Sequence, residues 1–281
     1  MDAEVDAEAE EAERLLESTV EAAASPFPPG GPRRVWRAPG GTVAWAYRAP
    51  RVEAERAGIA RMAGSSLRPP LRRATARMLA FEALGLPVDP LVVARARAAE
   101  AGAPRRRQGT REALLSMLAE GSSPRRALRR AGVPRRRVDR YLSAPVGIAS
   151  PEGPILGGLA PGWYRGVDGR IVAFRADRVR TGLLAVDLAG LLLGRPELRG
   201  AIAALHRAAV DAPGPAADEA LALARVALAC REQAHRAEPV AGLGGLVEGA
   251  LAAAPPVARV LIEGPAIDEE THRASPGEEV P

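Results

Sequence analysis

The sequence contains no lysine and no asparagine, and only 3% of its 281 residues are aromatic. Arginine, alanine, glycine and proline are abundant instead, a composition that a GC-rich coding sequence produces whatever the protein does. The net charge of +5 therefore says little about function. The scarcity of aromatic residues predicts a core of Leu, Val and Ala on packed helices, and argues against a large aromatic pocket.

Cysteine and histidine are also scarce. Cys230 is the single cysteine, which excludes an intrachain disulfide and a cysteine-based zinc site. Three scattered histidines do not form a metal site, and a reducing, cytoplasmic interior fits this composition best. We therefore expect no metal and no cofactor.

Long apolar runs and catalytic motifs are missing as well. The most apolar stretch, residues 182–194, is interrupted by Asp187 and is shorter than the roughly 20 residues of a membrane helix. Acidic residues follow Met1 directly, which excludes an ordinary signal peptide. No Walker loop, dinucleotide fingerprint, Gly-x-Ser-x-Gly elbow or His-Glu-x-x-His motif occurs. The sequence predicts a soluble protein without membrane contact that is not an enzyme.

The charge that is present is unevenly distributed. Residues 1–22 carry nine acids against one arginine, a net charge of −8, and residues 263–281 carry six acids against one arginine, a net charge of −5. Residues 104–142 carry twelve arginines against three acids, a net charge of +9. Positive charge is thus concentrated between two acidic ends, which favours an anionic partner for the middle of the chain.

Composition and periodicity divide the chain into six parts, and the predicted fold is mainly α. It combines a tri-helical helix-turn-helix, a C-terminal helical bundle and two small β-hairpins. The parts are an acidic tail (1–30), a helical unit with a hairpin (31–103), the helix-turn-helix (104–144), a linker (145–162), a hairpin with C-terminal helices (163–262) and a second acidic tail (263–281).

Outside the centre, three local patterns predict particular elements. Residues 35–47 form a hairpin around Pro-Gly-Gly, and residues 163–174 form another that turns at Asp168 and Gly169, a dipeptide suited to positive φ. Apolar residues at helical spacing predict a helix over 71–85, and Asp89 is placed to cap the next one.

Three short helices are predicted over residues 110–142. Thr110 begins the first, whose apolar face ends where Gly121 can take a left-handed turn. Ser123 caps the second, with proline at its first position, and Gly132 and Val133 make the turn to the third. The third helix, residues 134–142, buries Val138 and leaves its arginines outside.

The stretch from Ser123 to Leu142 resembles the helix-turn-helix of site-specific recombinases, phage terminase small subunits and many regulators. It departs from them at Pro134, where those families usually have Ser or Thr. The resemblance implies four contacts to base edges in the major groove, from Arg135, Arg136, Asp139 and Arg140. It implies phosphate contacts from Arg105, Arg106, Arg107, Arg111, Arg125, Arg126, Arg129 and Arg137.

The predicted function is therefore sequence-specific binding of double-stranded DNA, as a transcriptional regulator. One alternative is a DNA-packaging or segregation component similar to a terminase small subunit, and another is a protein-interaction scaffold that binds no nucleic acid. A dimer would favour regulation and a large ring would favour packaging. The apolar face of residues 221–228 could close an intrachain bundle or join copies of the chain as a homo-oligomer.

Overall fold

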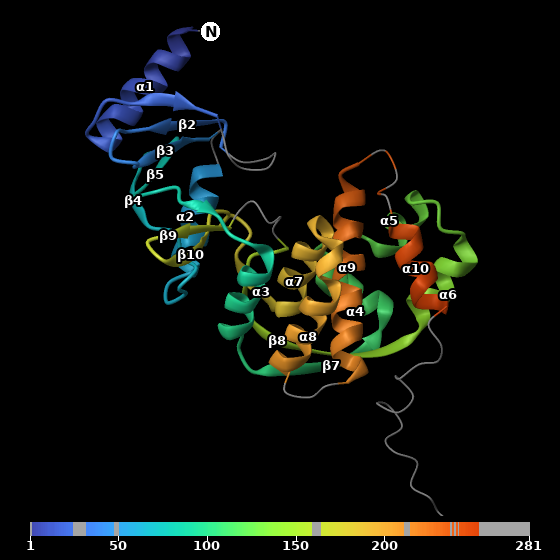
Figure 1. Cartoon of the computed structure of the whole chain (residues 1–281). Helices are drawn as coiled ribbons and strands as arrows, with labels where there is room; N and C mark the ends of the chain where they lie inside the picture. The colour runs from blue at the N-terminus through green and yellow to red at the C-terminus, as the bar shows by residue number, and fades with distance from the viewer. Residues whose placement is uncertain are drawn as a thin grey trace, which may run out of the picture.

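The computed structural model describes residues 2–24, 32–47, 51–158, 164–210, 214–236, 238, 240 and 242–252. Figure 1 shows two lobes, a sheet lobe made by residues 2–81 and a helical lobe made mainly by residues 90–155 and 180–252. The acidic tail predicted at 263–281 and the last residues of the predicted linker, 159–162, lie outside the described residues.

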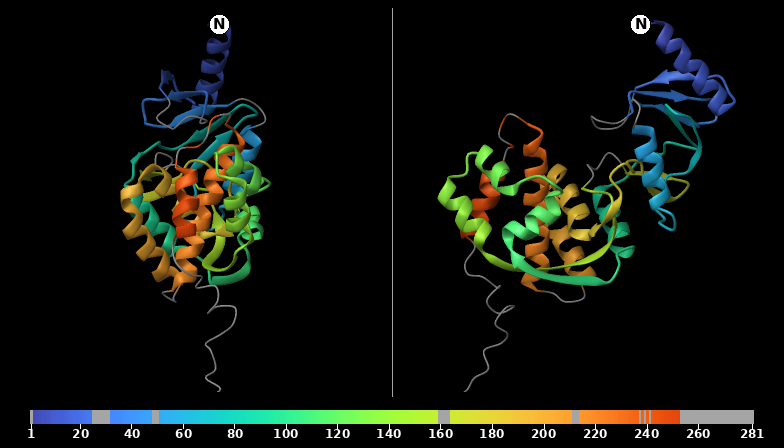
Figure 2. Two further views of the ribbon diagram at one scale, coloured as in Figure 1. Left: turned by 90° about the vertical axis from the view of Figure 1, so that its right-hand side faces the viewer. Right: turned by 180° about the vertical axis from the view of Figure 1, so that it is seen from behind.

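The sheet lobe is built on five antiparallel strands in the order β1-β2-β3-β5-β4. The strands are β1 (Glu21–Ala23), β2 (Arg34–Arg37), β3 (Val43–Ala46), β4 (Leu71–Ala74) and β5 (Met78–Phe81). Strands β2 and β3 form the hairpin that the sequence predicted, with Arg37 opposite Val43. Helices cover both faces of this sheet, as the back view in Figure 2 also shows.

Alternate residues of β3 serve the two faces, as the two-residue repeat of a strand requires. Val43 and Trp45 belong to the main core with helix α2 (Arg51–Arg61), whereas Ala44 and Ala46 pack against helix α1 (Asp2–Leu16). The acids of α1 pair with arginines of the sheet lobe, so this segment is attached to the sheet along one face. The pairs are Glu4–Arg33, Glu8–Arg34 and Glu11–Arg77, and Glu17, directly after the helix, pairs with Arg73.

The helix predicted over residues 71–85 is absent, because β4 and β5 occupy that stretch. All four residues of β5 are buried, since α1 lies on one side of the sheet and α2 on the other. A strand buried on both faces has no alternation of apolar and polar residues. A short apolar run of this kind cannot be separated from a helix by periodicity.

Helix α9 (Pro215–Ala234) runs through the middle of the helical lobe and contacts five other helices. Its apolar face is buried within the chain, so the residues considered for a homo-oligomer serve the intrachain bundle instead. The helices around it are α4 (Arg111–Ala119), α5 (Pro124–Arg130), α7 (Leu184–Gly194), α8 (Arg199–Val210) and α10 (Leu243–Ala252). The lobe also contains α3 (Pro90–Ala99) and a short 3-10 helix, η2 (Pro196–Leu198).

The three central helices form at the predicted positions, with α6 (Arg135–Ser143) as the third. Thr110 accepts a hydrogen bond from the amide of Ala113, and Ser123 accepts one from the amide of Arg126. These helices are nevertheless not a separate unit, because α4 and α5 pack on α9 and α10 packs on α6. The apolar faces predicted to close a small three-helix domain form part of the core of the helical lobe.

Strands also flank this helical segment. Strand β7 (Pro104–Thr110) pairs with the first part of β8 (Pro145–Ile155), and β11 (Arg180–Leu183) pairs with the last part of β8. The predicted linker over 145–162 is thus largely strand. Its prolines obscured the strand, yet each half of β8 has a partner on one side only, and proline is tolerated at such an edge.

The small remaining sheet has the order β10-β9-β6 and carries the second predicted hairpin. Strands β9 (Tyr164–Val167) and β10 (Arg170–Ala173) are joined by Asp168 and Gly169, which have φ of 48° and 74°, as the sequence indicated. Strand β6 (Leu86–Pro87) pairs with β9. The described residues therefore contain three antiparallel sheets, and the predicted mainly-α fold with two small hairpins is wrong.

Candidate functional site

The segment from Phe174 to Val179, which we call the connecting segment, joins the sheet lobe to the helical lobe. Phe174 packs on Trp45 and Phe81, with ring centroids 5.0 Å and 5.2 Å away. Glu55 of α2 accepts hydrogen bonds from the amides of Ala176 at 2.8 Å and Asp177 at 3.1 Å. The path of the connecting segment is therefore set by the sheet lobe.

Gly58, one turn further along α2, allows this close approach. A Cβ atom at position 58 would fall on the carbonyl group of Ala176, far inside van der Waals contact. Only glycine lets the helix and the connecting segment lie this close together without a shift of one backbone.

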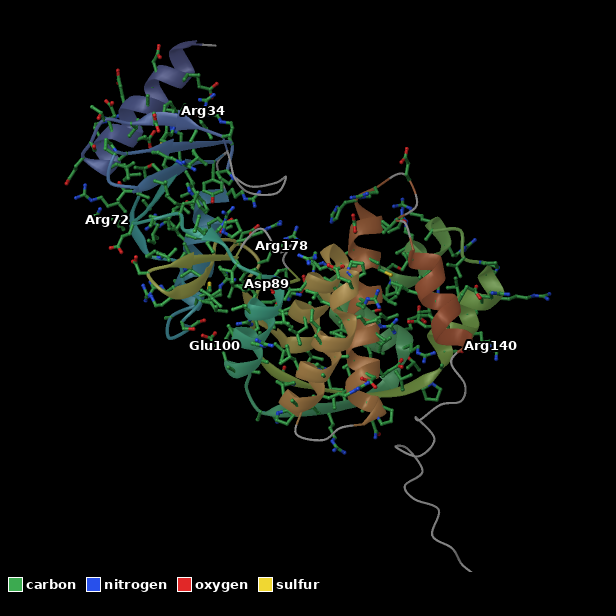
Figure 3. The ribbon with its side chains drawn as sticks, in the orientation of Figure 1. Arg34, Arg72, Asp89, Glu100, Arg140 and Arg178 are labelled. Carbon is green, nitrogen blue, oxygen red and sulfur yellow. The ribbon has the colours of Figure 1, made fainter. Side chains whose placement is uncertain are left out.

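A cleft of about 400 Å³ opens where the connecting segment meets the helical lobe. Figure 3 shows Arg178, one of its lining residues, between the two lobes. The lining combines the end of α2, the connecting segment, the turn after α4 and the end of α9. Its residues are Arg61, Glu120, Ser122, Asp177, Arg178, Val179, Arg180, Arg231 and His235.

The charges that line this cleft do not balance. Four arginines face two carboxylates, an excess of two positive charges with histidine neutral. Glu120 pairs with Arg180 and lies 3.6 Å from Arg231. Asp177 is already paired with two arginines outside the lining, Arg51 at 3.6 Å and Arg175 at 3.3 Å.

Glu120 reaches its partners from an unusual backbone conformation. Its φ of 50° lies in the left-handed region, and Gly121 follows at 77°. A non-glycine residue in this region costs roughly 1–2 kcal/mol. The turn after α4 thus places a carboxylate against the cleft arginines at the expense of local strain.

Other contacts fix some of the arginines but leave Arg178 without a partner in the part of the chain that the structure describes. Arg61 donates to the carbonyl oxygen of Val179 at 2.6 Å, and Arg231 donates to that of Gly157 at 3.4 Å. Among the described residues, no hydrogen bond or ion pair joins the side chain of Arg178 to another group. Its guanidinium is therefore available to a molecule in the cleft.

The arginines lose some of their basicity in this setting. Burial, together with the charge of Arg231, lowers the pKa of Arg178 and lowers that of Arg180 to about 10. Burial and then Arg175 lower the pKa of Arg231. Arginine keeps its proton at neutral pH, so the lowered pKa values reflect partial desolvation of these cations and their repulsion of one another.

The backbone of residues 156–158, after β8, lies beside the cleft arginines. The carboxylate of Asp187 on α7 accepts from the amides of Leu156 at 2.9 Å and Gly158 at 3.3 Å. A Cβ at position 157 would lie 2.8 Å from a guanidinium nitrogen of Arg180. No carboxylate projects from these three residues, Leu156, Gly157 and Gly158.

Replacement of Glu55 by Gln is expected to remove a pH dependence of stability. Burial, followed by the charge of Asp177, raises the pKa of Glu55 from 4.5 to about 7 in the folded chain. Its stabilising contribution is therefore complete below pH 4.5 and is lost as the pH rises through 7. Urea unfolding from pH 4 to 8 should show the wild-type chain losing stability relative to E55Q over this interval.

The difference between the two curves isolates Glu55 from other titrating groups. Burial lowers the pKa of His206 to about 4, so that residue favours folding as the pH rises, but it is present in both proteins. Parallel curves for wild type and E55Q would contradict the assignment.

The residues predicted to contact DNA lie elsewhere, on the helical lobe. Figure 3 places Arg140 at the edge of this lobe that is remote from the sheet lobe. Asp139, expected to accept from cytosine, pairs with Arg125 and lies 3.8 Å from Arg135. Arg136 and Arg140 are exposed on α6, and Arg126 and Arg129 lie on α5, where they line a second surface hollow with Arg125.

Several residues of the predicted phosphate-binding set have protein partners. Arg111 pairs with Glu219 and stacks over the ring of Tyr141. Arg125 also pairs with Glu112, Arg137 pairs with Glu248 of α10, and Arg105 and Arg107 lie near Glu152. Arg106 is exposed on β7. None of these residues lines the cleft, so the structure does not bring them together with it.

The cleft residues escaped the sequence analysis because nothing in their pattern marks them. Arg61 and Arg231 stand on two different helices, and Arg178 and Arg180 follow a hairpin in a chain that is rich in arginine throughout. The available signal was weak. It consisted of Gly157 and Gly158 after an apolar pair, Ile155 and Leu156, followed later by the isolated Asp187 in an apolar helix.

Solved structures identify the fold. The chain is similar to a Thermobifida fusca protein assigned as a fructosamine-3-kinase, with 20% identity, a TM-score of 0.54 and coverage of 86% of this chain and 98% of that one. It is similar to the macrolide 2'-phosphotransferase from Brachybacterium faecium, with 18% identity, a TM-score of 0.52 and coverage of 89% and 98%. It is also similar to a choline/ethanolamine kinase family protein from Mesorhizobium loti, with 13% identity, a TM-score of 0.54 and coverage of 93% of this chain and 95% of that one. No family model and no curated protein matches the sequence.

These similarities overturn the interpretation drawn from the central helices. The resemblance to helix-turn-helix proteins was local, whereas the fold of almost the whole chain is shared with kinases and phosphotransferases. The predictions of a DNA-binding regulator, of a packaging component or scaffold, and of double-stranded DNA as the partner are wrong. The prediction that the chain is not an enzyme depended on DNA binding and is overturned with it. No described helix has the length and apolar character to cross a membrane.

Proposed function

We propose that the chain is a small-molecule-binding protein of the phosphotransferase fold, and that the arginine-lined cleft is its binding site. The observation that carries the proposal is a polar cleft of about 400 Å³ between the two lobes of a fold shared with kinases of small molecules. This volume lies in the range of small-molecule sites. The single, buried cysteine fits the reducing cytoplasm, which we propose as the location.

The fold implies a nucleotide with magnesium, and protein kinases provide the residues with which this chain can be compared. In protein kinases a lysine on strand β3 pairs with a glutamate of the next helix, and an aspartate and an asparagine hold the metal. Here the glutamate has a counterpart in Glu55 on α2, but the chain contains no lysine and no asparagine. The side chains close to Glu55 include Tyr47, Arg51 and Asp177.

The loop after β8 differs in the same way. The kinase motif His-Arg-Asp-Leu-x-x-x-Asn corresponds in position to the sequence from Leu156 to Trp163. Gly158 occupies the position of the aspartate, and Trp163 occupies that of the asparagine. Asp177, the carboxylate nearest in the connecting segment, is held by two arginines. Within the described ranges, no group of three acidic, His or Cys side chains could hold a metal ion.

The residues present therefore do not fit a magnesium–nucleotide site of the kinase type. No step through a metal ion follows from them. The proposal concerns recognition of the small molecule, for which the chain's own arginines and backbone groups provide the contacts.

Filling the cleft should abolish binding whatever the charge of the ligand. Ser122 lines the cleft and is half-buried, so Ser122→Trp would occupy the space with an indole ring. Ser116 is exposed on α4, the helix before the turn that carries Ser122, and lies outside the cleft lining, so Ser116→Trp is the matched control. Thermal-shift screening of anionic, neutral and cationic metabolites, followed by calorimetry, should yield a ligand that S116W binds and S122W does not.

Two results would reject this site. One is a ligand that binds both tryptophan variants equally, and the other is a screen in which the folded wild-type chain binds nothing.

A further inference from the structure

We propose that the cleft binds the phosphate groups of its ligand through arginine side chains, without a magnesium ion. This inference rests on the proposed function and specifies its ligand class. The phosphate can belong to inorganic pyrophosphate or to a phosphorylated metabolite, since both present the same oxygen atoms.

Arg97, elsewhere in the chain, is a buried arginine whose charge is neutralised by a carboxylate. Arg97 is buried, yet Asp187 lies 2.8 Å from its guanidinium and raises its pKa in spite of that burial. The cleft arginines Arg178, Arg180 and Arg231 shift in the opposite direction. Arg180 and Arg231 are partly buried and Arg178 is exposed toward the cleft, where four arginines face two carboxylates, and an anion would supply the missing negative charge.

The type of cation points to phosphate. A guanidinium presents its N–H groups as a planar fork that pairs with two oxygens of a phosphate at once. Arg178 has no partner among the described residues, and Arg180 and Arg231 share the single carboxylate of Glu120. These three side chains come from three elements, the connecting segment, β11 and α9, and all of them line the cleft.

The same arrangement disfavours a metal ion and a cationic ligand. Magnesium is held by carboxylates and water, whereas Asp177 is committed to Arg51 and Arg175, and Glu120 to Arg180. A magnesium ion or an amine such as choline would add positive charge to a site that already has an excess of two. In this cleft, arginine takes the charge-neutralising role that magnesium has in kinases.

The test uses pyrophosphate as the probe and the intact chain. Calorimetry is expected to show binding in the presence of a chelator, and weaker binding when magnesium is added, because the magnesium complex carries less negative charge. Arg178→Ala is expected to weaken binding about tenfold to 100-fold, the usual effect of losing a hydrogen bond between charged groups. R178K keeps the positive charge but loses the planar pair of N–H donors, so its affinity for pyrophosphate should lie between those of the wild type and R178A.

Arg126→Ala is the matched control, because Arg126 lies on α5, outside the cleft lining. The affinity of R126A for pyrophosphate should equal that of the wild type. Pyrophosphate binding that requires magnesium, or that is equal in R178A and R126A, would overturn the proposal.

The same variants separate failure of this inference from failure of the proposed function. If a neutral or cationic compound binds and is lost in S122W while pyrophosphate does not bind, the cleft is a small-molecule site but not a phosphate site. If pyrophosphate binds S122W as well as wild type, the anion lies outside the cleft and both proposals fail. Comparison of phosphate, pyrophosphate and sugar phosphates then identifies the source of the phosphate group.

Discussion

Asp187→Ala is expected to lower the free energy of unfolding by about 3–5 kcal/mol, as loss of one partner from a buried ion pair does. Asp187 is 1% exposed and Arg97 is 7% exposed, so the change would leave the buried guanidinium without its nearest carboxylate and with only the more distant Glu100, at 3.5 Å. The amides of Leu156 and Gly158 would lose their acceptor at the same time. Urea unfolding followed by circular dichroism measures the effect.

Asp218→Ala is the matched control, because it removes a carboxylate from an ion pair at the surface. Asp218 and Arg207 are each 46% exposed and 2.7 Å apart. Solvent screening limits such pairs to about 1 kcal/mol or less. Equal losses in D187A and D218A would show that the loop after β8 does not depend on Asp187.

A single methyl group at position 58 is expected to have the second large effect. Gly58→Ala places a carbon on the carbonyl group of Ala176, and neither backbone can rotate away as a side chain would. We expect a loss of about 2–3 kcal/mol or more, the upper range for overpacking. Because Glu55 holds the same segment, its hydrogen bonds to Ala176 and Asp177 should weaken too.

Gly200→Ala makes the identical change at an exposed position of helix α8, where nothing lies within 4 Å of the added carbon. There the methyl group should stabilise the chain by about 0.4–1 kcal/mol, since it restricts the unfolded chain and suits a helix. Opposite signs for the two variants in thermal unfolding support the close contact at Gly58. A gain in stability for G58A would show that α2 and the connecting segment are not in contact.

Local structure was predictable wherever a capping or turn residue marked it. Thr110 and Ser123 cap their helices, Asp89 accepts from the amide of Leu91, and Asp168 and Gly169 turn the second hairpin. These signals depend on a few neighbouring residues, and so they hold in any fold. They could not show that strands from both sides of the central helices would pair and join them to one lobe.

The candidate site could not be predicted from the sequence for a related reason. The arginine density that directed attention to α5 and α6 reflects composition, whereas the cleft depends on which arginines lack carboxylates. Arg125 lies in the densest basic run and is balanced by Glu112 and Asp139, but Arg178 stands apart and is not balanced. That difference exists only after residues from α2, α4, α9 and the connecting segment have been brought together.

The aromatic contact of Phe174 has a mechanical consequence. Because Phe174 is packed on Trp45, a hinge motion of the sheet lobe must carry the connecting segment and Arg178 with it, while Arg231 stays with α9. The cations of the cleft would therefore move with two different lobes, and their mutual repulsion would oppose closure of the cleft. A dianion placed between them would turn that repulsion into attraction, so occupancy and closure would be one equilibrium.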